Sequence, residues 1–287
     1  MIVVRIIGGL GNQMFQYAFY KCLKKKYENV KCDIQGYEKY KLHNGFDLEN
    51  VFDIQLDKAS IAEIEQLTNS YKTNIISKVI RKVFGDKSSH IVENKFELNL
   101  MQSNKNYYLD GYWQTEKYFG GQHELRKDFK FKEDSNHTYV QTEEMIKSSN
   151  SVSLHVRRGD YLGNNTYAQL DELYYIKAIN LIQSQITDPV FFVFSDDLTW
   201  VKENLIHRLG ANAKIIYPEN KESSVQIDLK MMSLCKHNII ANSSFSWWGA
   251  WLNNNHDKMI VMPKKWYTIT EINEKHYKQM PENWIKI

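Results

Sequence analysis

Cysteine is scarce in this chain of 287 residues, which has only Cys22, Cys32 and Cys235 and no C-x-x-C pair. An odd number without paired spacing argues against a disulfide framework and a zinc site, and fits a reducing compartment. Long apolar runs are also missing: Val190–Phe194 is far shorter than the ~18 residues of a membrane-spanning helix. The N-terminus enters a strand at once, without the features of a signal peptide. The sequence predicts a soluble, cytoplasmic protein with at most peripheral membrane contact.

The net charge is small, at +3. Nucleic-acid-binding proteins concentrate basic residues on one face, whereas the basic runs here, Lys24–Lys26 and Lys78–Lys82, are short. We therefore expect no nucleic-acid partner and interpret each run as a solvated helix face. Apolar and charged fractions of 43% and 25% are those of an ordinary globular protein and exclude the disordered and fibrous classes.

Predicted strands and helices alternate along much of the chain. The β-branched run Ile2–Ile7 leads into Gly8–Gly11 and a helical pattern over 12–26, which is the opening of a parallel α/β unit. A second series starts near residue 151. Its expected strands are 151–156, 190–194, 214–217, 238–241 and 259–262, and its expected helices are 169–185, 198–209 and 224–235. Both series are typical of doubly wound sheets.

Two such series predict an α/β fold with two Rossmann-like domains facing across a cleft. We place the N-terminal domain at residues 1–145, as the expected acceptor side, and the C-terminal domain at residues 146–287. In one alternative, the last residues of the chain pack back on the first domain. Residues 39–105 yield one helix near 61–67 and a lysine-rich helix near Lys78, and no function is assigned to them.

Ligands of parallel sheets bind beyond the carboxyl ends of the strands, where Arg157 and Arg158 follow the strand 151–156. Guanidinium groups match phosphate oxygens and suit a diphosphate. Gly159 permits a turn, and Asp160 can orient one arginine. The competing interpretation is an ordinary strand end paired with a neighbouring acid.

The segment Asn242–Trp251 also follows a strand and opens a helix. Ser243 and Ser244 there offer hydroxyls beside free backbone N–H groups, a ready anion site. The alternative is plain N-capping by Ser244 or Ser246, with the tryptophans of this segment as core.

The glycine turn Gly8–Gly11 resembles a dinucleotide fingerprint only superficially, because Met14 stands where the third glycine is needed. Gly11 with the amides of Asn12 and Gln13 suits recognition of a polar sugar at least as well.

Carboxylates supply two further candidates. Asp196 and Asp197 end the strand 190–194, and they would either cap the next helix or contact a ribose or an arginine. A metal would need further ligands that are not nearby, so no metal and no cofactor are expected. Asp228 flanks the buried stripe of its helix and, if it faces the ligand, can accept both N–H donors of a guanine edge.

Five segments occur in an order that resembles the family 11 glycosyltransferases, the bacterial-type α-1,2-fucosyltransferases. They are Gly8–Ala18, Gly111–Gln114, His155–Tyr161, Phe194–Asp197 and Ala241–Leu252. The resemblance implies a GT-B architecture and inverting, metal-independent transfer of fucose from GDP-β-L-fucose to the 2-hydroxyl of a galactose-terminated glycan. In that architecture the C-terminal domain, residues 146–287, would bind GDP-fucose.

The resemblance also implies roles for single residues. Arg157 would hold the departing β-phosphate with Arg158 assisting, and His155 and Asp228 would contact guanine. Ser243 to Phe245 would contact the phosphates, and Asn12 with Gln13 the fucose side. A related fucosyltransferase type has a glutamate where this chain has Asn165, so the general base stays open. One alternative is a glycosyltransferase of similar architecture that uses another nucleotide sugar, or that joins fucose by another linkage or to another acceptor, including protein O-fucosylation. The others are a nicotinamide oxidoreductase and a non-catalytic sugar-binding protein.

Overall fold

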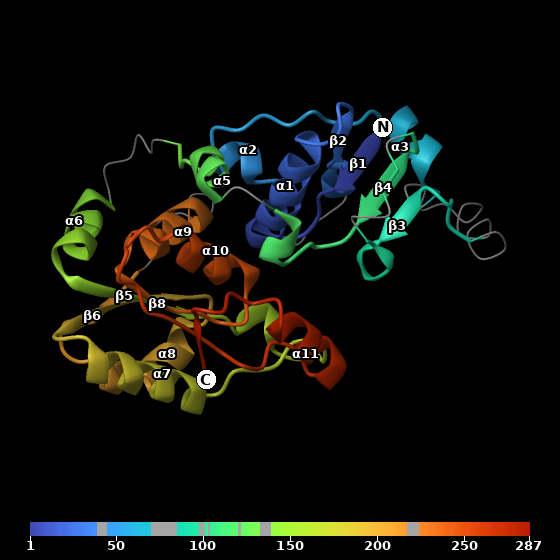
Figure 1. Cartoon of the computed structure of the whole chain (residues 1–287). Helices are drawn as coiled ribbons and strands as arrows, with labels where there is room; N and C mark the ends of the chain where they lie inside the picture. The colour runs from blue at the N-terminus through green and yellow to red at the C-terminus, as the bar shows by residue number, and fades with distance from the viewer. Residues whose placement is uncertain are drawn as a thin grey trace. The chain divides into compact units, whose positions relative to one another are not determined.

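The computed structural model describes residues 1–38, 45–69, 85–97, 101–102, 104–119, 122–132, 139–216 and 224–287. The chain divides into two compact units, Met1–Lys132 and Glu133–Ile287, and each contains its own parallel sheet (Figure 1). The prediction of an α/β fold with two parallel sheets is confirmed.

The first unit has the strand order β2-β1-β4-β3. Its described strands are β1 (Ile2–Arg5), β2 (Val30–Asp33), β3 (His90–Val92) and β4 (Tyr107–Asp110), and its described α-helices are α1 (Leu10–Lys24), α2 (Leu48–Val51), α3 (Ile61–Leu67) and α5 (Gln122–Asp128). Helix α1 begins two residues earlier than predicted, because Gly8 turns the chain with a φ of +88° and Gly9 then serves as N-cap. Helix α3 has the predicted bounds and a capping box between Ser60 and Glu63. Strands β2, β3 and β4 were not predicted, and the lysine-rich helix near Lys78 lies outside the described residues.

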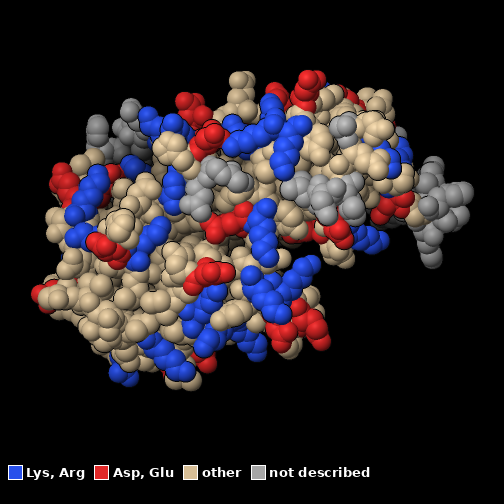
Figure 2. Space-filling model, in the orientation of Figure 1, with Lys and Arg blue, Asp and Glu red and all other residues tan. Residues whose placement is uncertain are grey.

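Acidic partners accompany the lysine run at the end of α1. Lys24, the last residue of the helix, is paired with Asp57, and Lys25, its C-cap, is paired with Glu124. Figure 2 shows basic and acidic side chains interleaved on the face that it draws. This local pairing agrees with the interpretation of the lysine run as a solvated helix face.

The second unit has six parallel strands in the order β10-β9-β8-β5-β6-β7. These strands are β5 (Asn150–Val156), β6 (Pro189–Ser195), β7 (Lys214–Ile215), β8 (His237–Ile239), β9 (Ile260–Met262) and β10 (Ile285–Lys286). The described α-helices are α6 (Val140–Ser148), α7 (Glu172–Gln185), α8 (Leu198–Asn204), α9 (Ser224–Leu234), α10 (Ser244–Leu252) and α11 (Thr270–Tyr277). Every strand predicted after residue 150 is present, and β10, α6 and α11 were not predicted.

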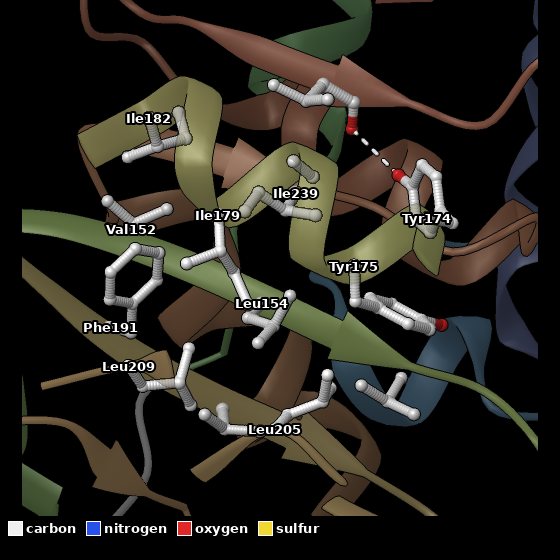
Figure 3. Close-up of a cluster of buried hydrophobic side chains, with 14 of the residues drawn as sticks. Val152, Leu154, Tyr174, Tyr175, Ile179, Ile182, Phe191, Leu205, Leu209 and Ile239 are labelled. Carbon is white, nitrogen blue, oxygen red and sulfur yellow. Dashed lines mark hydrogen bonds between the residues drawn. The ribbon is translucent and has the colours of Figure 1, made fainter. Parts of the chain in front are cut away.

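The core of this unit lies on both faces of the sheet, since successive side chains of a strand point to opposite faces. Phe191 and Val193 of β6 pack with residues of α7 and α8, and Phe192 and Phe194 pack with residues of α6 and α9. Figure 3 shows the first cluster, in which the hydroxyl of Tyr174 donates to the carbonyl of Ile240 at 2.6 Å. A strand buried on both faces reads as a continuous apolar run, which is why Val190–Phe194 could be recognised from sequence.

The division between the units falls before residue 133, earlier than the expected boundary at 145/146. The physical reason is α6, whose Ile146 is fully buried against Met231 and Met232 in the second unit. The last residues also belong to that unit, because Ile285 of β10 pairs with Val261 of β9.

Candidate active site

The end of β5 and the end of β6 meet at one edge of the second sheet. The two strands are paired over their whole length, so that Val156 stands opposite Ser195. The residues that follow them are therefore neighbours: Arg157 and Arg158 after β5, and Asp196 with Asp197 after β6. This edge brings two of the sequence-predicted groups together.

Asp196 holds the turn that follows β5. One of its carboxylate oxygens accepts a hydrogen bond from the backbone N–H of Arg158 at 2.8 Å, and the other accepts one from the backbone N–H of Gly159 at 3.1 Å. A Cβ on Gly159 would lie 2.9 Å from that second oxygen, closer than real Cβ atoms come. The glycine is thus required for the carboxylate to approach the backbone.

Arg157 lies between two carboxylates. Its Nε is 2.8 Å from Asp160 Oδ1 and its Nη1 is 3.2 Å from Asp196 Oδ2. Burial lowers the pKa of Arg157, but the charges of Asp196 and Asp160 outweigh it, so its pKa is raised above the ordinary value. The side chain stays 26% exposed. Arg157 is therefore a fixed, permanently charged group with a face open to a ligand.

Arg158 is braced against α8. Its Nε lies 3.3 Å from Asp197 Oδ2, and its guanidinium carbon lies 4.3 Å from the centre of the Trp200 ring, a cation–π contact. Asp197 is also the N-cap of α8 and accepts from the backbone N–H of Trp200 at 3.0 Å. Capping by Asp197 agrees with one sequence interpretation, while the contact of Asp196 with an arginine agrees with the other.

A third segment, after β8, approaches the same edge. Ser243 is the N-cap of α10 and its hydroxyl accepts from the backbone N–H of Phe245 at 3.3 Å. The cap is thus Ser243, not Ser244 or Ser246 as the capping interpretation had it. The hydroxyl of Tyr161 donates to the carbonyl of Asn242 at 3.1 Å, which ties this segment to the turn after β5.

The tryptophans after this cap are core residues, as predicted. Trp247, Trp248 and Trp251 are 1%, 0% and 3% exposed. They anchor α10, whose first turn carries no acidic residue, so the N-terminal end of this nine-residue helix keeps its positive character.

His155 points to the face of the sheet opposite Leu154 and Val156, which pack with α7 and α8. Its ring lies 5.9 Å from that of Phe245. Burial, and next the charge of Arg157, lowers the pKa of His155 to about 3, so the imidazole is neutral at ordinary pH. Its Nδ1 is buried without a hydrogen-bond partner among the described residues. A buried polar atom of this kind requires a partner, which a bound ligand can supply.

Asp228 lies on α9, next to Ile227 of the cluster that also contacts Phe245. Burial raises the pKa of its carboxyl to about 7. Its Oδ1 is buried, and no described residue donates a hydrogen bond to it. The sequence left open whether this side chain is exposed. The residue is partly exposed, its Oδ1 is buried, and no described residue compensates its charge.

The candidates of the first unit take different roles. Gln13 is 0% exposed, and its amide group binds the backbone of residues 8 and 45 through Nε2 and of residues 47 and 48 through Oε1. These contacts use both ends of the amide, so the geometry gives Gln13 a structural role in place of the expected contact with fucose. Gly11 is a buried residue of the first turn of α1 and does not carry the turn; Gly8 does. Asn12 accepts a hydrogen bond from Gln114 at 2.7 Å.

Two side chains near the arginines were missed. Trp200 contacts Arg158, and Tyr161, whose ring centre is 5.9 Å from the guanidinium carbon of Arg157, stacks on Tyr167 at 4.5 Å. In the sequence, only their positions could have indicated these contacts. Trp200 lies three residues after the capping Asp197, in the first turn of α8, and Tyr161 directly follows Asp160.

In the part of the chain that the structure describes, no helix combines the length and the apolar character needed to span a bilayer. The same residues contain no group of three or more His, Cys, Asp or Glu side chains arranged to hold a metal ion.

Known proteins with similar sequences are glycosyltransferases. The sequence pattern of the family described as glycosyl transferase family 11 matches residues 1–287. An α-1,2-colitosyltransferase of Escherichia coli is 33% identical over 300 residues, covering 100% of this chain and 99% of that protein. The O-antigen biosynthesis glycosyltransferase WbnK of Escherichia coli is also 33% identical, over 91% of this chain and 93% of its own. A rat galactoside α-(1,2)-fucosyltransferase 2 is 31% identical over 109 residues, 36% of this chain and 30% of that protein.

Solved structures share the architecture at low sequence identity. NodZ α-1,6-fucosyltransferase co-crystallised with GDP has a TM-score of 0.57 at 13% identity, over 86% of this chain and 90% of NodZ. The same enzyme soaked with GDP-fucose has a TM-score of 0.54 at 14% identity, over 88% of this chain and 91% of NodZ. The GT-B-like fold is therefore confirmed, and the chain belongs to glycosyl transferase family 11.

Proposed function

We propose that this protein transfers L-fucose from GDP-β-L-fucose to the 2-hydroxyl of a terminal galactose, with inversion and without a metal ion. The observation that carries the proposal is Arg157, a partly exposed guanidinium held by Asp160 and Asp196 at the carboxyl edge of the second sheet. Its permanent charge and fixed position suit a diphosphate leaving group.

The reaction builds negative charge on the β-phosphate as the bond from fucose C1 to the phosphate oxygen breaks. A cation that is already in place stabilises this charge more than it stabilises the bound substrate, which lowers the barrier. Arg157 would supply that cation, and the N-terminus of α10 beyond Ser243 would receive phosphate oxygens at its N–H groups. Arg158, braced by Asp197 and Trp200, would keep the turn rigid.

Guanine would be recognised on the face of β5 that carries His155, opposite the face that packs with α7 and α8. The ionised carboxylate of Asp228 can accept from the N1–H and the 2-amino group of guanine, as carboxylates do from base edges. His155 would offer its neutral ring beside Phe245. Both side chains have buried atoms that no described residue satisfies, which supports a polar ligand there.

Asp160 is not assigned as the general base. It is 46% exposed but accepts from Nε of Arg157 at 2.8 Å, so its proposed role is to orient that arginine. We look for the base outside residues 155–160, for example on the departing phosphate.

Colitosyl transfer is the second candidate, since an α-1,2-colitosyltransferase is 33% identical over the whole chain. Colitose is L-fucose without its 3-hydroxyl. A site that hydrogen-bonds this hydroxyl would reject colitose strongly, because a buried polar group would be left unpaired. Comparison of kcat/KM for GDP-fucose and GDP-colitose on one acceptor separates the two functions.

Arg157→Ala tests the proposal directly. We expect the variant to lose transfer from GDP-fucose to lactose by about a hundredfold or more, because one fixed group for the developing charge is removed. The matched control is Arg208→Ala, which removes an exposed arginine of the same unit. Substantial turnover by Arg157→Ala, or thermal stabilisation of the wild-type protein by UDP but not by GDP, would contradict the proposal.

A further inference from the structure

Tyr112 is a large aromatic side chain that the fold leaves 44% exposed, directly after β4. The next residue, Trp113, has a φ of +56°. This left-handed conformation is unfavourable for a bulky residue and persists only where surrounding contacts hold it.

Several contacts fix this turn. Glu93 accepts hydrogen bonds from the backbone N–H groups of Tyr112 at 2.8 Å and Trp113 at 3.1 Å. The ring of Trp113 is fully buried and stacks on Phe19 at 4.3 Å. A Cβ on Gly111 would lie 2.5 Å from Cβ of Glu93, so a glycine is needed there. With Trp113 turned into the core and its backbone clamped, the turn presents Tyr112 to solvent.

The turn lies where a ligand is expected in a parallel sheet. In the order β2-β1-β4-β3, the strands β1 and β4 are neighbours. From β1 the chain continues to β2 on one side, whereas β4 is reached from β3 on the other side. Ligands of open α/β sheets bind beyond the carboxyl ends of the strands at such a switch point. The buried Gln16 joins the two segments: it accepts from the N–H of Ile7 and donates to the carbonyl of Gly111, at 2.9 and 3.0 Å. The pair Asn12 and Gln114 adds amide groups between the same segments.

We propose that Tyr112 is the stacking platform for the acceptor sugar, a β-galactoside whose C3–H, C4–H and C5–H bonds form one apolar face. Aromatic rings with a few polar groups beside them are how proteins bind ligands of mixed polarity. Asn12 and Gln114, which are hydrogen-bonded to each other at 2.7 Å, lie on the neighbouring segments and make the surroundings of the ring polar. The proposal rests on the proposed function, since it assumes a galactose acceptor.

The test is the binding of lactose to the GDP-loaded protein, measured by saturation-transfer NMR, together with the KM for lactose in transfer. We expect Tyr112→Ala and Tyr112→Leu to raise the KM for lactose about tenfold, because one stacking contact is lost. Both variants should also abolish saturation transfer to H3, H4 and H5 of galactose. Tyr112→Phe should behave as wild type. The thermal shift by GDP should be the same in all variants. Leu173→Ala, at a 57% exposed residue of α7, is the control for removal of an exposed apolar group.

Two results would overturn the role of Tyr112. One is an unchanged lactose KM and saturation pattern in both Tyr112→Ala and Tyr112→Leu. The other is that Tyr112→Leu has a lower kcat, or a smaller thermal shift by GDP, while its KM for lactose equals that of the wild type. NMR binding does not require turnover, so a wild-type protein that binds lactose through Tyr112 but transfers no fucose would refute the proposed function and retain this inference.

Discussion

The carboxylate of Asp196 occupies the space beside Gly159 that any larger residue would need. Its Oδ2 lies 2.9 Å from the position of a Cβ on Gly159, while the same carboxylate binds two backbone N–H groups of the turn and Arg157. One acid thus sets the backbone of the turn and the side chain of its first arginine.

Gly159→Ala should displace Asp196 and loosen Arg157. We expect kcat to fall about tenfold or more, since small displacements of a fixed charged group weaken its effect on the transition state. The melting temperature should change little, because the turn is partly exposed. Gly36→Ala is the control, since nothing lies within 4 Å of the Cβ that it adds. Full activity of Gly159→Ala would mean that this contact does not position the arginine.

Asp196→Asn and Asp197→Asn should differ in effect. Asparagine at 196 loses the charge that pairs with Arg157, so kcat should fall by about tenfold to a hundredfold while the KM for GDP-fucose changes less. Asparagine at 197 still caps α8 and loses only the partner of Arg158. Its kcat should stay within a fewfold of wild type. Equal losses in the two variants would count against the separate roles of Arg157 and Arg158.

GDP affinity should depend on pH through Asp228. Its pKa is about 7 in the free protein, and only the ionised carboxylate accepts both N–H donors of guanine. The Kd for GDP should therefore decrease about tenfold from pH 6 to pH 8. His155 stays neutral over this range and adds nothing. Calorimetric titration with GDP at several pH values, on the wild-type protein and on Asp228→Asn, checks this prediction. Protonation of GDP itself affects both proteins equally, so only the difference between their pH profiles reports on the carboxyl group. Parallel pH profiles in the two proteins would exclude the carboxylate.

The same carboxyl should cost stability when no nucleotide is bound. Its pKa is raised from 3.8 to about 7 on folding, so its favourable contribution is complete below pH 3.8 and is lost as the pH rises through 7. At pH 8 the free Asp228→Asn protein should melt a few degrees above wild type. At pH 3.5 the difference should shrink, and a variant that melts lower at pH 8 would contradict the uncompensated buried charge.

Transfer should not require a divalent cation. Arg157 and the N-terminus of α10 would supply the positive charge that a metal ion provides elsewhere. We expect EDTA, added to the protein as purified, to leave the rate of transfer unchanged. Strong inhibition that Mg²⁺ reverses would contradict this part of the mechanism.

The central strands of the second unit, β5, β6, β8 and β9, could be predicted because most of their residues are buried. Val190–Phe194 and 151–156 carry continuous or alternating apolar residues, and the glycines and acids after them mark the strand ends. The first unit was harder. His90–Val92 is a three-residue strand inside a polar region, and its place beside β4 comes from tertiary pairing.

The site shows the same division. The residue types of Arg157–Asp160 suit a phosphate group, but taken alone they left an ordinary strand end paired with an acid as the alternative. Gln13 has the same residue type that a sugar ligand would require, yet it binds the loop at 45–48, which is distant in sequence. Tyr112 depends on a backbone conformation at Trp113 that no composition rule predicts.

Linkage analysis of the product by NMR tests the central claim most directly. The wild-type protein is incubated with GDP-fucose and lactose, and the glycosidic bond of the purified trisaccharide is assigned. The account predicts one α-linked fucose on the 2-hydroxyl of galactose. Fucose at another position, or no product from GDP-fucose where GDP-colitose gives one, would contradict it.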